Sequence, residues 1–280
     1  MKLPLLAAAI LLLASCASQG AGAQGASVTP APVIAAERAF AARAGEIGWV
    51  PAFREFVAPD GLMPGPQGYV SAPERLAQTP DNGNRDLAWQ PAFAGIARSG
   101  DIGFTTGPAS FDATRTPAIY YFTIWRRQAD GLWRWIYDGG PGPVEEPAST
   151  AFGAEPLTLP VATQGRAAAA DEVNAIEAGA ENAGALVRHL AGDAHVYRAG
   201  RPRAVGAAAA AALAYPNAAV AYRVTHTFAS EAGDLVFTLG EASWEEDGQA
   251  RGGLFARVWQ NRPAGWAIVY DQLIIRRAQN

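Results

Sequence analysis

The sequence predicts an α+β chain made of two tandem cone-shaped barrels, each with helices packed on a curved, mostly antiparallel sheet. Three observations favour this fold class. The chain of 280 residues contains a long internal repeat. Each half opens with apolar residues at helical spacing, and each half ends in a run of strands with alternating side chains. Helices followed by a meander of strands are typical of α+β domains, in which helices cover one face of the sheet.

The repeat is the strongest of these signals. The glycine-rich segment 100–107 returns at 233–240, and each copy is followed by a central Trp and then by a segment that ends in Tyr-Asp. A spacing of 133 residues separates Asp101 from Asp234 and also Asp138 from Asp271. Repeats of solenoid proteins are roughly 20–50 residues long, so this period indicates a duplicated domain.

The first 15 residues have the pattern of a signal peptide, with Lys2 followed by an apolar run too short to span a membrane. The run ends in Leu13-Ala14-Ser15-Cys16, which resembles the lipobox of bacterial lipoproteins. The resemblance implies lipidation of Cys16, and several acyl chains give stable attachment to a membrane. Because Ala17 follows the cysteine, we expect the periplasmic face of the outer membrane. The alternative is an ordinary secretory signal with a chance cysteine. Residues 16–32, rich in Ala, Gly, Ser and Pro, are expected to form a flexible tether.

The first predicted domain covers residues 33–140. Its apolar-periodic segment, 33–57, is expected to split into two helices around Gly45, Gly48 and Pro51. Ser71 and Glu74 form a capping-box pattern for a further short helix. Four strands are then predicted, separated by turn residues such as Ser99-Gly100-Asp101; they cover 87–97, 102–111, 119–127 and 133–139.

Residues 141–165 have no strong period and are expected to form an interdomain linker. The second predicted domain, 166–280, repeats the order of the first. Its predicted helices cover 166–190 and 204–214, with a short strand at 194–197. Four strands follow, at 218–229, 235–244, 254–260 and 266–275.

Composition excludes several function classes. The formal net charge is −4 and no basic patch stands out, so the phosphate-neutralising surface of a nucleic-acid-binding protein is missing. The three histidines show no metal-ligand spacing, and we predict no metal site. The sequence has no nucleophile elbow, no P-loop and no thiol besides Cys16, and it predicts no cofactor.

Several segments of the first half together are similar to SnoaL-like domains of the nuclear-transport-factor-2-like superfamily, which includes ketosteroid isomerases and polyketide cyclases. They are Ala36-Glu37-Arg38-Ala39-Phe40, Trp89-x-Pro91, the stretch 99–107, and Trp125-Arg126-Arg127 with Asp130-Gly131-x-Trp133. The second half keeps only the strand part of this pattern. The resemblance implies a cone-shaped barrel and frequent dimers, within one chain or between two. It does not imply an activity, because the fold hosts enzymes and binding modules alike.

The recurring acids Asp138 and Asp271 are the candidate catalytic residues. Strict alternation puts Trp133, Trp135 and Tyr137 on one strand face and Asp138 on the other. A carboxylate buried beside aromatic rings has a raised pKa and can act as a general base. The alternative is that each acid caps its strand or pairs with an arginine such as Arg126, Arg134 or Arg257.

The candidate ligand-binding residues are Trp125 and Trp259, which recur on the central strand, and Tyr222 and His226 on an alternating strand. Tyr222 and His226 are predicted to share a face toward the cavity, which would make the second domain the functional copy. The alternative for all four is core packing. His226 has no equivalent in the first half, where Phe93 stands in its place, and this favours binding over duplicated catalysis.

The sequence therefore predicts an envelope lipoprotein that binds an apolar small molecule or a partner and touches the membrane only through its anchor. The first alternative is a cofactor-independent isomerase, cyclase or hydrolase with Asp138 or Asp271 as general base. The second alternative is a purely structural pseudo-dimer.

Overall fold

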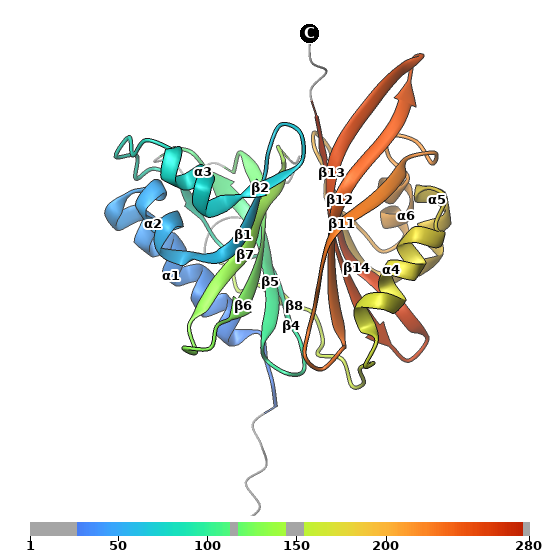
Figure 1. The fold of residues 1–280 in the computed structure, drawn as a ribbon, viewed down its shortest axis with the longest axis horizontal. Helices are drawn as coiled ribbons and strands as arrows, with labels where there is room; N and C mark the ends of the chain where they lie inside the picture. Colours follow the sequence, from blue (N-terminus) through green and yellow to red (C-terminus); the bar gives the residue numbers. More distant parts are fainter. Residues whose placement is uncertain (1–26, 113–116, 144–153, 277–280) are drawn as a thin grey trace, which may run out of the picture.

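The computed structural model describes residues 27–112, 117–143 and 154–276. They form two α+β domains in tandem, and the structure confirms the predicted fold class. Figure 1 shows the two sheets facing each other in the middle of the molecule, with the helices of each domain on the outside. The predicted signal peptide, Cys16 and most of the predicted tether lie outside the described residues.

The first domain carries its helices before its long strands. Its elements are α1 (Ala31–Ile47), α2 (Trp49–Phe56), β1 (Val57–Pro64), β2 (Tyr69–Ser71), α3 (Ala72–Gln78), β3 (Ala88–Trp89), β4 (Phe93–Ile96), β5 (Ile102–Ser110), β6 (Ile119–Arg127) and β7 (Trp133–Gly142). The predicted helix break is confirmed at Gly48, whose φ of 98° ends α1. Ser71 caps α3 by accepting a hydrogen bond from the backbone N–H of Glu74, also as predicted.

The second domain has a similar element order. Its elements are α4 (Ala169–Gly179), α5 (Ala183–Leu186), a 3₁₀ turn (Val187–His189), β9 (Leu190–Arg198), β10 (Ala204–Val205), α6 (Ala207–Leu213), β11 (Ala221–Ala229), β12 (Leu235–Glu246), β13 (Gln249–Arg262) and β14 (Gly265–Ile275). The single helix predicted over 166–190 is wrong. The chain turns extended at Ala180, and the side chain of Asn182 starts α5 by accepting from the N–H of Ala185.

The two sheets have the same strand order. The first runs β2-β1-β7-β6-β5-β4 and the second β10-β9-β14-β13-β12-β11, and β1 and β9 each pair in parallel with the last strand of their domain. The predicted limits of the domains stay predictions.

The segment between the domains adds a further strand, β8 (Leu157–Thr158), to the first sheet. It pairs in parallel with β4, and Leu159 directly after it is buried. Part of the predicted linker is therefore an edge strand that covers β4, because its backbone N–H groups bond to the carbonyls of Ala92 and Ala94.

The sheets pack face to face through aromatic rings. Phe122 stacks on Tyr270 with ring centroids 4.2 Å apart, and His195 stacks on Phe93 at 4.0 Å. Several hydrogen bonds join the two domains, among them those from Gln272 Nε2 to Tyr137 Oη (3.1 Å), from the Tyr69 hydroxyl to the carbonyl of Phe255 (2.7 Å) and from the backbone N–H of Arg98 to Asp234 Oδ2 (2.8 Å). The strand faces that a single domain would expose are therefore buried inside the chain.

The strand that carries each candidate acid contains a one-residue β-bulge. In β7, Tyr137 pairs with Ile124 and Trp135 pairs with Trp125, so Ile136 is the extra residue. In β14 the extra residue is Val269, at the equivalent position. A bulge reverses the alternation of side chains beyond it. The prediction that Asp138 lies opposite Trp135 is therefore wrong, because both side chains face the helices.

A bulge also separates Tyr222 from His226. Val224 pairs with Gly240 and His226 with Leu239, which leaves Thr225 as the extra residue of β11. The prediction that both side chains share one face is wrong for this reason. His226 faces the first domain and contacts the ring of Tyr69 at 5.9 Å, whereas Tyr222 faces the helices of its own domain.

Within the described residues, no helix is long and apolar enough to cross a membrane.

Candidate functional site

A buried glutamate joins the first helix of each domain to its sheet. Glu37 on α1 is fully buried and accepts hydrogen bonds from the indole N–H groups of Trp89 (2.5 Å) and Trp125 (2.9 Å) and from the hydroxyl of Thr105. Glu177 on α4 accepts from Trp259 Nε1 and from Thr238 Oγ1, each at 2.9 Å. Because a buried polar group needs partners, these donors fix how each helix sits on its sheet.

Trp125 and Trp259, predicted to line a pocket, are the donors in these bonds. Both are fully buried, and neither lines the cavity of the first domain.

The cavity lies in the first domain, between α2, the chain leading into β3, and the strands β5, β6 and β7. It has a volume of about 420 Å³. Its walls are mainly apolar and aromatic; they comprise Trp49, Phe53, Asn84, Leu87, Trp89, Ala109, Phe111, Ile119, Tyr120, Tyr121, Asp138, Gly139, Gly140 and Gly142. An apolar hollow with a few convergent polar groups is the usual form of a small-molecule site.

Asp138 is the carboxyl group in that wall. It is half-buried, and its Oδ2 accepts a hydrogen bond from Thr123 Oγ1 at 2.7 Å. No ion pair with an arginine is found for it within the described residues. Burial raises the pKa of Asp138 to about 8; Thr123 opposes the rise and Glu37 adds to it. Near neutral pH the group can therefore give or accept a proton.

Tyr121 is a second polar group of the wall. Its hydroxyl is buried and makes no hydrogen bond of standard geometry with the described residues. Burial raises the pKa of Tyr121 well above the ordinary value, so the hydroxyl stays protonated at neutral pH.

Asp271 occupies the equivalent position in the second domain, but it is fully buried and paired. Its Oδ2 accepts a hydrogen bond from Arg257 Nε at 2.7 Å, and its Oδ1 forms an ion pair with Arg198 Nη2 at 2.7 Å. Arg257 also binds Glu177 at 2.6 Å. Burial alone would lower the pKa of Arg257, but Glu177 and Asp271 raise it above the usual value. Asp271 is therefore paired with arginines, as the alternative interpretation of the sequence describes.

Strand register shows why the two domains differ inside. Thr123 pairs with Asp138 across the sheet, and Arg257 pairs with Asp271. Arg257 thus replaces Thr123. By the same comparison, Phe255 occupies the position equivalent to Tyr121, and Leu273 occupies the position equivalent to Gly140. Phe255 and Leu273 belong to a tight apolar cluster with Trp244 and Ala242, which fills the space that is open in the first domain.

Tyr222 packs against this cluster and also borders a hollow of about 400 Å³ beside α4, which Glu177 and Thr225 line as well. Its ring packs on Phe255 with centroids 5.0 Å apart, and the guanidinium carbon of Arg257 lies 4.7 Å from its centroid. His226 lies at the interface between the sheets, as described above. The structure therefore does not bring His226 together with Tyr222 and Asp271.

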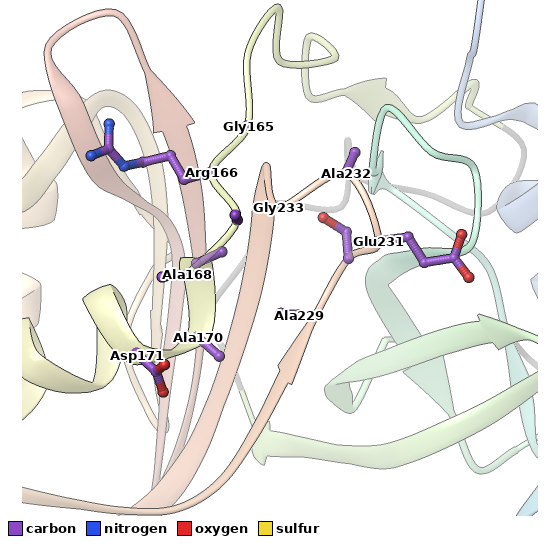
Figure 2. Close-up of a pocket in the computed structure, with 12 residues that line it drawn as sticks. Gly165, Arg166, Ala168, Ala170, Asp171, Ala229, Glu231, Ala232 and Gly233 are labelled. Carbon is purple, nitrogen blue, oxygen red and sulfur yellow. The ribbon is translucent and has the colours of Figure 1, made fainter.

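A second hollow, of about 240 Å³, lies where α4 begins beside the turn between β11 and β12 (Figure 2). The charged side chains of Arg166 and Glu231 extend to opposite sides of it. The hydroxyl of Ser230 is already bonded to Asp234 at 2.7 Å. The polar groups that line this hollow do not point toward a common centre, so we do not regard the hollow as the functional site.

No cluster of three metal-binding side chains occurs among residues 27–112, 117–143 and 154–276.

Sequence reasoning missed the roles of Glu37 and Glu177, and it named Arg257 only as one of three possible partners of the recurring acids. Glu37 stands in the segment that resembles SnoaL-like domains, yet nothing local marks it as buried. A signal was present for Arg257. It stands two residues before the recurring Trp259, and the first half has Thr123 two residues before Trp125.

The chain is similar to several solved structures, and the TM-scores of these similarities are low. An NTF-2-like protein of unknown function from Shewanella oneidensis is 13% identical over 38% of this chain and 96% of its own length, with a TM-score of 0.30. A protein of unknown function from Pectobacterium atrosepticum is 21% identical over 39% of this chain and 92% of its own, also at 0.30. An Ntf2-like protein involved in plasmid conjugation is 9% identical over 83% of this chain and 89% of its own, at 0.24. TM-scores this low assign neither a family nor an activity to the chain.

No protein-family model matches the chain, and no curated protein matches it.

A matched pair of substitutions tests whether only the first domain is open. Ala109 lines the cavity, and Ala242 is its equivalent in the filled interior. We expect Ala109→Leu to change the free energy of unfolding by less than about 1 kcal/mol, because the added carbons enter empty space. Ala242→Leu should cost about 1–3 kcal/mol through overpacking. Chemical denaturation of both variants measures this, and equal costs would contradict the assignment.

Proposed function

We propose that the chain is a small-molecule-binding module whose ligand occupies the cavity of the first domain, while the second domain is a scaffold. The observation that carries the proposal is the contrast between two equivalent interiors. One is open, apolar and carries a carboxyl group with no arginine partner among the described residues. In the other, side chains fill the equivalent position and the acids are held in ion pairs, and a separate hollow of about 400 Å³ lies between α4 and β11.

The ligand is an apolar or amphipathic molecule that fits within about 420 Å³. Aromatic walls favour burial of its apolar part, and Asp138 with Tyr121 fixes the orientation of its polar group. Membership of the SnoaL-like group of the nuclear-transport-factor-2-like superfamily is part of the proposal. It rests on the sequence segments 36–40, 89–91 and 99–107.

Proton transfer by Asp138 is the second candidate function. The observation that favours it is the pKa of about 8, because a general acid or base works best with a pKa near the working pH. Asp271 has no such role in this proposal, since it is held between two arginines.

Titration with a neutral apolar probe tests the proposal. Cyclohexylmethanol should change the fluorescence of wild-type protein, because Trp49 and Trp89 border the cavity. We expect Ala109→Leu to weaken this binding at least tenfold by occupying the cavity. An exposed substitution such as Asp60→Asn serves as the control. Wild-type protein that shows no saturable response to this alcohol, nor to the amine and the carboxylate with the same apolar body, would contradict the binding module.

Turnover separates the two candidates. If wild-type protein catalyses the exchange of a carbon-bound proton of its ligand with solvent deuterium and Asp138→Asn does not, the result favours proton transfer over binding alone.

We propose further that the chain is an envelope lipoprotein anchored through Cys16. Support comes from the sequence Leu13-Ala14-Ser15-Cys16 after a short apolar run. Cells grown with a labelled fatty acid should incorporate the label into wild-type protein and not into Cys16→Ser. Wild-type protein that stays unlabelled would contradict the proposed lipid anchor.

A further inference from the structure

The second domain holds a cation inside its cone. The guanidinium of Arg257 lies between two carboxylates, with Nε 2.7 Å from Asp271 and Nη1 2.6 Å from Glu177. Aromatic rings flank it as well, because its central carbon lies 4.7 Å from the ring centroid of Tyr222 and 4.8 Å from that of Phe255. Both the acids and the π-faces of the rings stabilise a positive charge at this point.

The first domain repeats these surroundings without the cation. Asp138 takes the place of Asp271 and Glu37 the place of Glu177, while Thr123 stands where Arg257 would be. Trp89 and Tyr121 take the positions of Tyr222 and Phe255, and both line the cavity. The described residues that line the cavity include no arginine, lysine or histidine.

We infer that the cavity of the first domain binds an organic cation, a primary amine or guanidine carried on an apolar body. Its charged group pairs with Asp138, in the place that the guanidinium of Arg257 takes in the second domain. This inference rests on the proposed function and names the class of its ligand.

Electrostatics favour a cation over a neutral ligand of the same shape. Among the described residues, the titratable groups that interact electrostatically with Asp138 are Glu37 on α1, Tyr121 on β6 and Tyr137 on β7, and none of them supplies positive charge. Without a ligand, a proton neutralises Asp138. A bound ammonium replaces that proton, gains a charge-assisted hydrogen bond and contacts the aromatic walls.

The exchange of a proton for a cation predicts a pH dependence. Below pH 8 the ammonium must displace the proton of Asp138, so its affinity should rise about tenfold per pH unit toward pH 8 and then level off. A neutral ligand that fills the same space displaces no proton, and its affinity should stay flat.

Three probes with one apolar body test the inference. They are cyclohexylmethylamine, cyclohexylmethanol and cyclohexanecarboxylate, titrated calorimetrically into the full chain between pH 6 and pH 8. At pH 8 the amine should bind at least tenfold more tightly than the alcohol, and the carboxylate should bind most weakly. The heat of amine binding at pH 7 should depend on the buffer, because a proton is released.

Two carboxyl-to-amide variants complete the test. Asp138→Asn should weaken amine binding at least tenfold and leave alcohol binding within twofold. Asp60→Asn, at an exposed ion pair with Arg126, should change neither. If Asp138→Asn does not fold, the comparison of the three probes on wild-type protein still decides.

Equal affinity for amine and alcohol, or tighter binding of the carboxylate, would overturn the inference and leave the proposed binding module standing. If none of the three probes binds, the binding module itself fails and the inference fails with it.

Discussion

The buried glutamate between helix and sheet is the interaction on which both domains depend. An ionised carboxylate inside a protein is costly unless hydrogen bonds and opposite charge compensate it. Glu177 has both kinds of compensation, from Trp259, Thr238 and Arg257. Glu37 has only neutral donors, two indoles and a hydroxyl, and burial raises its pKa above the ordinary value despite them.

This difference also determines the environment of the neighbouring acid, Asp271 in the second domain and Asp138 in the first. In the second domain Arg257 ties Glu177 to Asp271 and closes the interior. In the first domain Thr123 interacts with both Asp138 and Glu37 but carries no charge. Asp138 is therefore left at a cavity wall with a raised pKa. The change from threonine to arginine at this position, together with Phe255 and Leu273 in place of Tyr121 and Gly140, thus separates the interior with the cavity from its equivalent in the second domain.

The sequence predicted the fold class, the helix break at Gly48 and the cap at Ser71, because those features depend on local chemistry. The prediction was wrong where one extra residue in a strand reversed the sheet face on which the following side chains lie. The bulges at Ile136 and Thr225 reverse the faces of Asp138 and His226, and nothing in the alternating pattern marks them. The acid was found by its recurrence, but its environment and its partners required the pairing of β6 with β7 and of β13 with β14.

The glutamates escaped prediction for another reason. Helix positions in the two halves do not keep the spacing of 133 residues that aligns the acids, so Glu37 and Glu177 show no repeat by that rule. Their role emerges only when the indole donors of the central strands are seen to point at them. Trp125 and Trp259 were recognised as recurring residues, and the repeat reflects this anchoring of helix to sheet.

The most direct test of the account is the titration of the Asp138 carboxyl in the full chain, followed by the ¹³C chemical shift of its side chain, with Asp138→Asn used to assign the resonance. The account predicts a midpoint near pH 8, because burial raises the pKa of Asp138 and no arginine among the described residues offsets that rise. A midpoint near pH 4, the ordinary range of an exposed aspartate, would show that the carboxyl is solvated or paired and would contradict the assignment of the first domain as the open, functional copy.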